Sequence, residues 1–117
     1  MHNFKELKVW QAAMAVSKAI FVTTRQFPSE EKFTLIAQMM RSSISIPSNI
    51  AEGCGRKSNK ELHQYLNISL GSAFELETQL ILAKEFNYIE ESNFTCLQLQ
   101  IIEVQRMLTG LQKSLNT

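Results

Sequence analysis

Residues 94–115, FTCLQLQIIEVQRMLTGLQKSL, place apolar side chains at alternating intervals of three and four residues. These positions are Phe94, Leu97, Ile101, Val104, Leu108, Leu111 and Leu115. Such spacing puts all of them on one face of an α-helix, and three heptads of it are typical of a helix that packs lengthwise against others. We therefore predict a helix over about residues 91–115 whose apolar face is buried in a helical bundle.

The same spacing occurs upstream, over about residues 59–86. Its apolar stripe contains small residues, which allow a neighbouring helix to approach closely; the positions are Leu62, Leu66, Ser69, Ala73, Leu76, Leu80 and Ala83. The predicted start of this helix carries the capping box Ser58-Asn59-Lys60-Glu61, in which a hydroxyl and a carboxylate satisfy free backbone donors. We predict another long helix here.

A third stripe, over about residues 30–54, contains a proline. Its positions are Phe33, Ile36, Met40, Ser43, Pro47, Ile50 and Cys54. Because the stripe resumes in register after Pro47, we predict a kink there rather than a break, with a hydroxyl of Ser42, Ser43 or Ser45 satisfying the freed carbonyl. Ser29 is the predicted N-cap, and Gly53 and Gly55 suit the C-terminus.

A first helix, over about residues 5–26, is apolar on two faces. One face carries Leu7, Trp10, Met14 and Phe21, and the other carries Val9, Ala13, Val16 and Ile20. Short connections force consecutive helices to run antiparallel. Residues 1–117 are therefore predicted to form one all-α domain, an antiparallel up-down-up-down four-helix bundle whose second helix is kinked at Pro47.

Composition favours a cytoplasmic protein that folds without staples. The chain has 117 residues and only four glycines and two prolines, which is too little turn chemistry for an all-β fold. It shows neither a signal peptide nor an apolar run long enough to span a membrane. Cys54 and Cys96 are expected to be unpaired thiols, at opposite ends of the bundle and roughly 30 Å apart by helical rise.

Charge is distributed unevenly along the chain although the net charge is only +1. Residues 1–60 hold nine Lys/Arg against four Asp/Glu, whereas residues 61–117 hold three against seven. The predicted topology gathers cations at one end of the bundle: Lys5, Lys8, Arg56, Lys57, Lys60 and Lys113. Such a patch can engage nucleic-acid phosphates, or it can simply be a solvated lysine-rich loop.

No catalytic or cofactor site is recognisable. A di-iron bundle needs Glu-x-x-His pairs, and neither these nor a nucleotide-binding glycine motif occurs. The two histidines, His2 and His63, are expected to be surface residues. The spacing of Arg56 and His63 resembles that of helical HEPN ribonucleases, a minor alternative. We predict no enzyme activity, no metal and no cofactor.

Polar residues accompany two of the apolar stripes. In the predicted helix over residues 30–54 they are Gln38, Arg41, Ser45, Asn49 and Glu52, and in that over residues 59–86 they are Ser72, Glu75 and Gln79. Polar side chains are costly to bury alone, so we expect them to pair between helices or between subunits. We interpret them as interface residues rather than catalysts.

Four segments resemble the 23S rRNA intervening sequence protein family over about residues 4–111. They are Phe4-x-x-Leu7-x-Val9-Trp10-Gln11, Phe27-Pro28-x-x-Glu31-x-Phe33-x-Leu35, residues 45–53 (SIPSNIAEG) and residues 71–80 (GSAFELETQL). The resemblance implies a four-helix bundle that assembles into a homopentamer. Some members are encoded within insertions in bacterial 23S rRNA genes. At Met39-Met40-Arg41 the chain departs from the family's more usual basic pair.

A similar protein, the accessory variability determinant of diversity-generating retroelements, binds nucleic acid and a reverse transcriptase. The resemblance therefore implies RNA or DNA, and a reverse transcriptase or ribosomal component, as partners. Our leading hypothesis is a cytoplasmic, non-enzymatic homo-oligomer that binds RNA or a nucleoprotein through its basic end. The alternatives are a structural or protein-binding oligomer without nucleic-acid affinity, and a HEPN-like ribonuclease.

Overall fold

Four long α-helices and two short 3₁₀ turns form the protein in a computed structural model that describes residues 3–115. The elements are η1 (Phe4–Glu6), α1 (Lys8–Thr24), η2 (Ser29–Glu31), α2 (Leu35–Cys54), α3 (Asn59–Glu85) and α4 (Glu91–Ser114). No strand occurs within residues 3–115. The predicted all-α class with four helices is confirmed.

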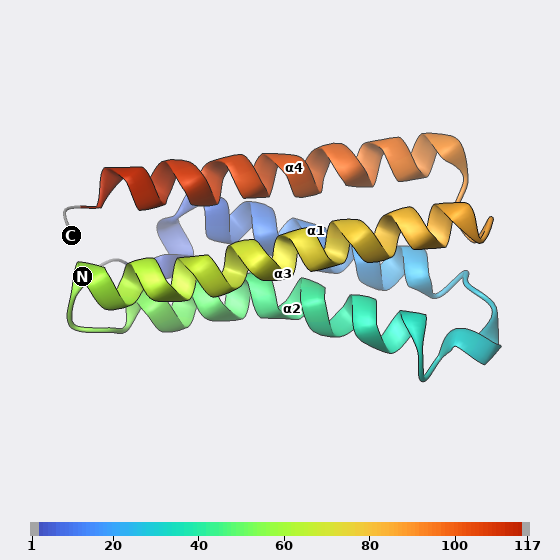
Figure 1. Cartoon of the computed structure of the whole chain (residues 1–117), viewed down its shortest axis with the longest axis horizontal. Helices are drawn as coiled ribbons and strands as arrows, with labels where there is room; N and C mark the ends of the chain where they lie inside the picture. The colour runs from blue at the N-terminus through green and yellow to red at the C-terminus, as the bar shows by residue number, and fades with distance from the viewer. Residues whose placement is uncertain (1–2, 116–117) are drawn as a thin grey trace.

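The helices lie side by side in a bundle of 44 × 25 × 20 Å (Figure 1). The α2–α3 connection and the end of α4 lie at one end, and the α1–α2 and α3–α4 connections lie at the other. α2 packs most extensively on α3, while α1 packs on α2 and α4, and α3 also packs on α4. This arrangement is compatible with the predicted up-down-up-down order. None of the described helices has both the length and the apolar character needed to cross a bilayer.

The core is built from the predicted stripes of α3 and α4. All seven stripe positions of α3 are buried. In α4 the four central positions are buried, namely Leu97, Ile101, Val104 and Leu108, and the outer three are half-buried. Burial of a leucine or isoleucine side chain stabilises the fold by about 1.5–3 kcal/mol. These stripes therefore supply much of the driving force for folding.

The two apolar faces of α1 differ in burial. Val9, Ala13, Val16 and Ile20 are buried, whereas Leu7, Trp10 and Met14 are half-buried and Phe21 is 49% exposed. The helix also begins later than predicted, because Leu7 is extended and separates η1 from α1. The second apolar face of α1 is therefore only partly covered within one chain.

The start of the second helix was predicted wrongly. α2 begins at Leu35 rather than at residue 30, and Ser29 opens the 3₁₀ turn η2 instead of capping a helix. Thr34 precedes α2 and makes no side-chain capping bond. Phe33, a member of the predicted apolar stripe, is 84% exposed. The stripe of α2 instead includes Met39 and Ile46, which are fully buried.

α2 continues through Pro47 without a break. A proline nitrogen cannot donate to the carbonyl four residues earlier, which here belongs to Ser43. That carbonyl accepts a hydrogen bond of 2.8 Å from the Ser17 hydroxyl of α1. The donor is thus on a neighbouring helix and is not one of the three upstream serines that the sequence suggested. The predicted bend at Pro47 stays a prediction.

The α3–α4 connection is held by backbone and side-chain bonds. Asn87 has a left-handed φ of 63°, and the amides of Asn87 and Tyr88 bond back to the carbonyls of Lys84 and Ala83. This is the Schellman arrangement that ends many helices. The Tyr88 hydroxyl donates to Glu31 at 2.9 Å and so joins this connection to η2.

Candidate nucleic-acid interface

All six predicted cations are exposed, and they come from four segments of the chain. Lys5 and Lys8 lie in η1 and at the start of α1, Arg56 and Lys57 lie in the α2–α3 connection, Lys60 lies in the first turn of α3, and Lys113 lies in the last turn of α4. We call these six residues the basic end. The connection and the end of α4 lie at the same end of the bundle in Figure 1. Glu6, Glu52 and Glu61 are the acidic residues of the same segments.

Hydrogen bonds to backbone amides hold the α2–α3 connection at both of its ends. The Gly55 amide donates to the Ala51 and Glu52 carbonyls, and the Arg56 amide donates to Gly53 at 3.1 Å. At the other side the Ser58 hydroxyl accepts from the Glu61 amide at 3.1 Å, which confirms the predicted cap. A short connection fixed in this way presents Arg56 and Lys57 in a defined position.

Gly53 serves close packing rather than a helix end. It is buried inside α2, and a Cβ added to it would lie 2.8 Å from Tyr65 Cβ and 2.9 Å from Leu62 Cδ1. Only Gly55 is the C-cap, and its φ of −83° is available to any residue. Gly53 therefore lets α2 and α3 approach closely just before the connection.

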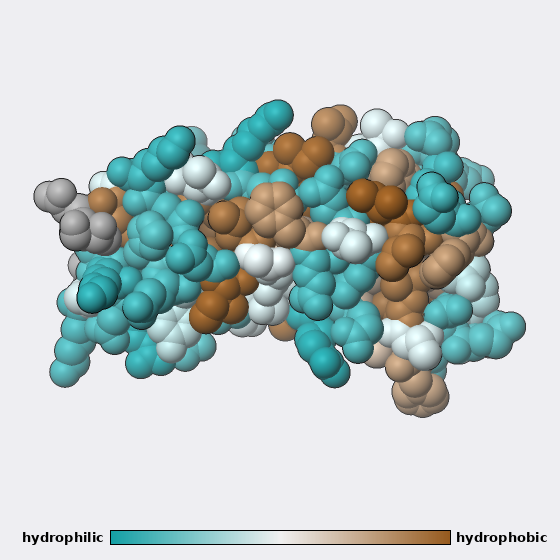
Figure 2. Space-filling view, in the orientation of Figure 1, coloured by the Kyte–Doolittle hydropathy of each residue, from teal (hydrophilic) through white to brown (hydrophobic). Residues whose placement is uncertain are grey.

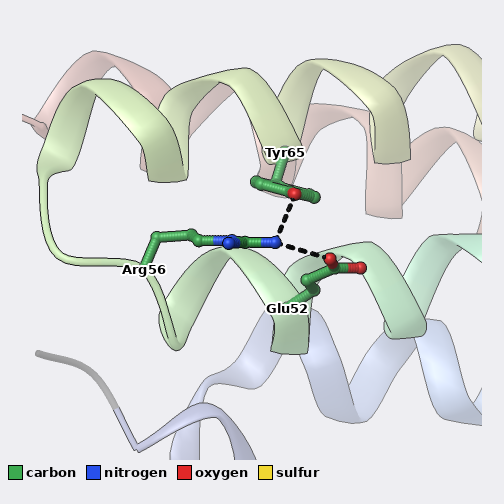
Figure 3. A network of polar contacts seen from close by, with 3 residues as sticks. All are labelled: Glu52, Arg56 and Tyr65. Carbon is green, nitrogen blue, oxygen red and sulfur yellow. Dashed lines mark hydrogen bonds and ion pairs between the residues drawn. The ribbon is translucent and has the colours of Figure 1, made fainter.

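Arg56 is engaged within the chain (Figure 3). Its guanidinium donates to the Glu52 carboxylate at 2.8 Å and to the Tyr65 hydroxyl at 2.6 Å, and it lies 4.9 Å from the centre of the Tyr65 ring. The hydrogen bond to Glu52 is the main reason that the pKa of Arg56 is raised. Because Glu52 offsets the charge of Arg56, the five lysines supply most of the positive charge of the basic end.

The same contacts bear on the ribonuclease alternative. The Arg56 guanidinium bonds to Glu52 and Tyr65, while His63 is half-buried and its backbone carbonyl accepts from Gln112 of α4 at 3.4 Å. The described contacts of Arg56 are therefore with two neighbouring side chains, Glu52 and Tyr65. His2, the other histidine, lies outside the described residues.

The predicted polar seam is partly an interface between α2 and α3. Ser45 bonds to Ser72 at 2.8 Å, and the Asn49 amide donates to Ser45. Gln79 accepts from Ser42 at 2.6 Å. Ser42 and Ser69 also belong to this interface although the seam prediction omitted them; both are buried, and Ser69 holds a position of the predicted apolar stripe whereas Ser42 does not.

Other members of the predicted seam face solvent. Gln38, Arg41 and Glu75 are exposed, and Glu52 is taken up by Arg56. The structure therefore brings Ser45, Asn49, Ser72 and Gln79 together between two helices and leaves the remaining seam residues on the surface. Every buried side-chain nitrogen and oxygen within residues 3–115 has a hydrogen-bond partner.

Thiols and carboxylates in the described part of the chain form no cluster. Cys54 is buried and Cys96 is exposed, and both are free. Burial raises the pKa of the Cys54 thiol. Within residues 3–115, no group of three or more His, Cys, Asp or Glu side chains is placed to hold a metal ion.

Comparison with known proteins places these features in a family. The 23S rRNA-intervening sequence proteins match residues 5–110. A solved structure, that of a protein of unknown function from the S23 ribosomal protein family of Bacteroides thetaiotaomicron, superposes with a TM-score of 0.84 at 26% identity. The match covers 91% of this chain and 99% of that one. No curated protein matches the chain.

Proposed function

Since the chain belongs to the 23S rRNA-intervening sequence protein family, we propose that it is a non-enzymatic homo-oligomer, a pentamer by family resemblance, that binds RNA through its basic end. A reverse transcriptase or a ribosomal component is the protein partner that this resemblance suggests. The observation that carries the proposal is the convergence of six exposed cations from four segments at one end of the bundle.

The form of the basic end supports binding to a phosphate backbone rather than to one small anion. Its lysines are exposed, and they come from η1, α1, the α2–α3 connection, α3 and α4, so they cover the end of the bundle instead of one pocket. Lysine is a flexible point charge that suits such contacts. Clustered cations displace the counterions condensed on nucleic acid, which favours binding of any exposed phosphate backbone.

Assembly would strengthen each of these contacts. One chain has a net charge of only +1, and a single set of exposed lysines binds weakly at physiological salt. Several basic ends held on one side of an oligomer would act together, because the later contacts become intramolecular. Oligomerisation and RNA binding are therefore parts of one proposal.

Fluorescence anisotropy with a labelled RNA hairpin tests the RNA-binding part. The variant Lys57→Gln/Lys60→Gln removes two exposed cations of the basic end, and Lys18→Gln/Arg106→Gln removes two exposed cations elsewhere as the matched control. We expect the first variant to bind more weakly and its log–log salt dependence to become shallower by roughly 0.7–0.9 for each lost phosphate contact. The control should bind like the wild type.

The same titration identifies the outcomes that would overturn the proposal. Equal weakening by both double variants would indicate general charge attraction rather than a site. Binding that is absent or insensitive to salt would favour the second candidate, a protein-binding oligomer without nucleic-acid affinity. Wild-type protein that cleaves the hairpin, with loss of cleavage in His63→Ala, would favour the ribonuclease.

The second candidate has its own support in exposed apolar side chains. Ten large apolar residues in the described chain are at least 40% exposed, among them Phe74 at 53% and Leu99 at 63%. Figure 2 shows apolar residues gathered over the middle of one face and over the end opposite the basic end, whereas the basic end is largely hydrophilic. Apolar area of this kind marks surfaces that bind protein.

A further inference from the structure

The outer side of α3 carries a cluster of exposed apolar residues. Phe74, Ile81, Leu82 and Phe86 are 40–53% exposed. Their spacings of seven, eight and twelve residues from Phe74 place them on one side of the helix and its C-cap, away from the buried stripe. We call these four residues the α3 face.

The charges beside the α3 face are negative. Glu75 and Glu85 are exposed on α3. The nearby cation, Lys84, is paired with Glu91 of α4 at 3.1 Å. The α3 face therefore presents apolar side chains together with two carboxylates that lack a counter-charge of their own helix.

A shallow groove between the end of α1 and the start of α2 has the opposite character. Phe21, Ile36 and Met40 contribute apolar side chains to its lining, and Arg25 and Lys32 contribute two cations. The Arg25 guanidinium lies 5.2 Å from the centre of the Phe21 ring, and the Lys32 ammonium lies 5.5 Å from that of Phe33. We call these five lining residues the α1/α2 groove.

Carboxylates near the α1/α2 groove form no ion pair with its two cations among the described residues. Glu31 is bonded to Thr34 and to Tyr88. Glu30 is exposed in η2 and is not among the residues that line the groove. The groove thus offers apolar surface flanked by two cations, which complements the α3 face in both hydrophobicity and charge.

The two surfaces also lie in the same half of the bundle along its long axis. The C-terminal half of α3 and the N-terminal part of α2 are both in the half of the molecule opposite the basic end (Figure 1). A rotation about an axis parallel to the long axis of the bundle leaves the position of each surface along that axis unchanged. Such a rotation can therefore bring the α3 face of one copy against the α1/α2 groove of the next. A contact between two different surfaces produces a ring when the rotation closes.

We propose that the α3 face of one copy packs into the α1/α2 groove of the next copy, with Glu75 and Glu85 beside the α3 face opposite the cations of the groove. This inference rests on the proposed homo-oligomer and names the surfaces that form it. It has one consequence for binding: every copy points the same way, so all basic ends lie on one side of the ring. An isologous dimer about a perpendicular two-fold axis would instead point its two basic ends in opposite directions.

Charge reversal tests the pairing of the two surfaces. Arg25→Glu/Lys32→Glu places like charges against the α3 face, and Glu75→Lys/Glu85→Lys does so from the other side. In analytical ultracentrifugation we expect each double variant to raise the dissociation constant of the oligomer by at least about tenfold. The quadruple variant should recover wild-type association, because it restores opposite charges. Arg106→Glu, an exposed cation of α4 outside both surfaces, is the matched control.

The results separate this inference from the proposed function. A wild-type protein that is monomeric at all concentrations would overturn the homo-oligomer and this interface with it. An oligomer that both double variants leave intact, or that the quadruple variant fails to restore, would overturn only the assignment of surfaces. Circular dichroism should show wild-type helix content in every variant, since all four positions are on the surface.

Cross-linking provides a second measurement that does not depend on charge. In a Cys96→Ser background we would introduce Arg25→Cys and Glu85→Cys and treat the protein with a short bis-maleimide. The doubly substituted chain should form a ladder of covalent multimers beyond the dimer, while either single substitution should form none. Cross-linked dimers from a single substitution would indicate an isologous contact and contradict the proposal.

Discussion

At the scale of single residues, Gly53 shows how one missing side chain sets the distance between two helices. A Cβ at this position would meet Tyr65 Cβ and Leu62 Cδ1 at less than 3 Å. Tyr65 Cβ is attached directly to the α3 backbone, so relief requires the helices to separate. The contact lies beside the connection that carries Arg56, and it therefore links packing to the candidate site.

We expect Gly53→Ala to destabilise the protein by about 1–3 kcal/mol, the range for overpacking a well-packed core. Gly110→Ala is the matched control, because Gly110 is in α4 with no atom within 4 Å of an added Cβ. There the better helix propensity of alanine should stabilise by about 0.5–1 kcal/mol. Urea unfolding of the two variants measures both values, and a stable Gly53→Ala protein would show that the close approach is unimportant.

The two cysteines should differ in reactivity for reasons of burial and pKa. Cys54 is 3% exposed and its pKa is raised by burial, so it holds little thiolate at neutral pH and is shielded from reagents. Cys96 is exposed. Maleimide labelling followed by mass spectrometry should find Cys96 modified in the native protein and both cysteines modified in denaturant. Rapid native labelling of Cys54 would show that the end of α2 opens readily.

At the scale of elements, the bond between Ser17 and the Ser43 carbonyl joins α1 to α2 at the point where Pro47 removes a helical donor. Such a donor from a neighbour lets a proline remain inside a helix without leaving a buried carbonyl unpaired. α1 therefore supports the continuity of α2 in addition to packing on it.

A double-mutant cycle tests this role. Ser17→Ala should cost about 1 kcal/mol or more, since it leaves a carbonyl without its donor. In a Pro47→Ala background the cost should fall, because the backbone amide that this substitution introduces can bond to the same carbonyl within the helix. Thermal unfolding of the four proteins gives the coupling energy. Equal costs in both backgrounds would mean that the serine and the proline act independently.

The bond between Tyr88 and Glu31 joins the α3–α4 connection to η2 and predicts a pH dependence. Hydrogen bonds from Thr34 and then Tyr88 lower the pKa of Glu31, and the bond to Glu31 is the main cause that raises the pKa of Tyr88. A carboxyl with a lowered folded pKa stabilises the fold above its unfolded pKa of about 4.3, and this contribution is lost as pH falls through the lower folded value. Tyr88 likewise stabilises the fold below its unfolded pKa of about 10, and this stabilisation is lost as pH rises through its raised folded-state pKa.

We therefore expect Tyr88→Phe to lower the melting temperature at pH 7. Between pH 5 and pH 3 the melting temperature of the variant should fall less than that of the wild type, because its Glu31 carboxylate contributes less stability that protonation can remove. The part due to Thr34 should remain. Differential scanning fluorimetry across this pH range compares the two proteins. Parallel melting curves at all pH values would contradict a contribution from this bond.

At the scale of the whole molecule, a single bundle leaves apolar surface exposed over the middle of one face and over one end, and the six cations of the basic end lie at the other end. Burial of that surface between copies would favour the folded state by mass action. The melting temperature should therefore rise with protein concentration in the wild type and rise less in the charge-reversed variants of the α1/α2 groove. Melting temperatures independent of concentration, in a range where sedimentation detects no monomer, would show that assembly and folding are not linked.

The sequence by itself determined the helical class, the four helices and most of the core. The stripes of α3 and α4 are regular and uninterrupted, so the period of 3.6 residues identifies both the element and its buried face. Ser58 was identifiable as a cap for a similar reason, because a capping bond spans only three residues. The segments of the family resemblance could likewise be recognised without coordinates.

Only the tertiary structure decided the features that depend on which helix lies beside which. The short turn η2 replaced the predicted first turn of α2, because bonds from Thr34 and Tyr88 to Glu31 stabilise a local conformation that periodicity does not report. Ser17 as the partner of Ser43, and Tyr65 as a partner of Arg56, likewise required two segments to be placed side by side. An apolar stripe predicts that a side chain is buried. Which residue it contacts depends on how the neighbouring helix is rotated about its axis and shifted along it, and both are set by packing of the whole core.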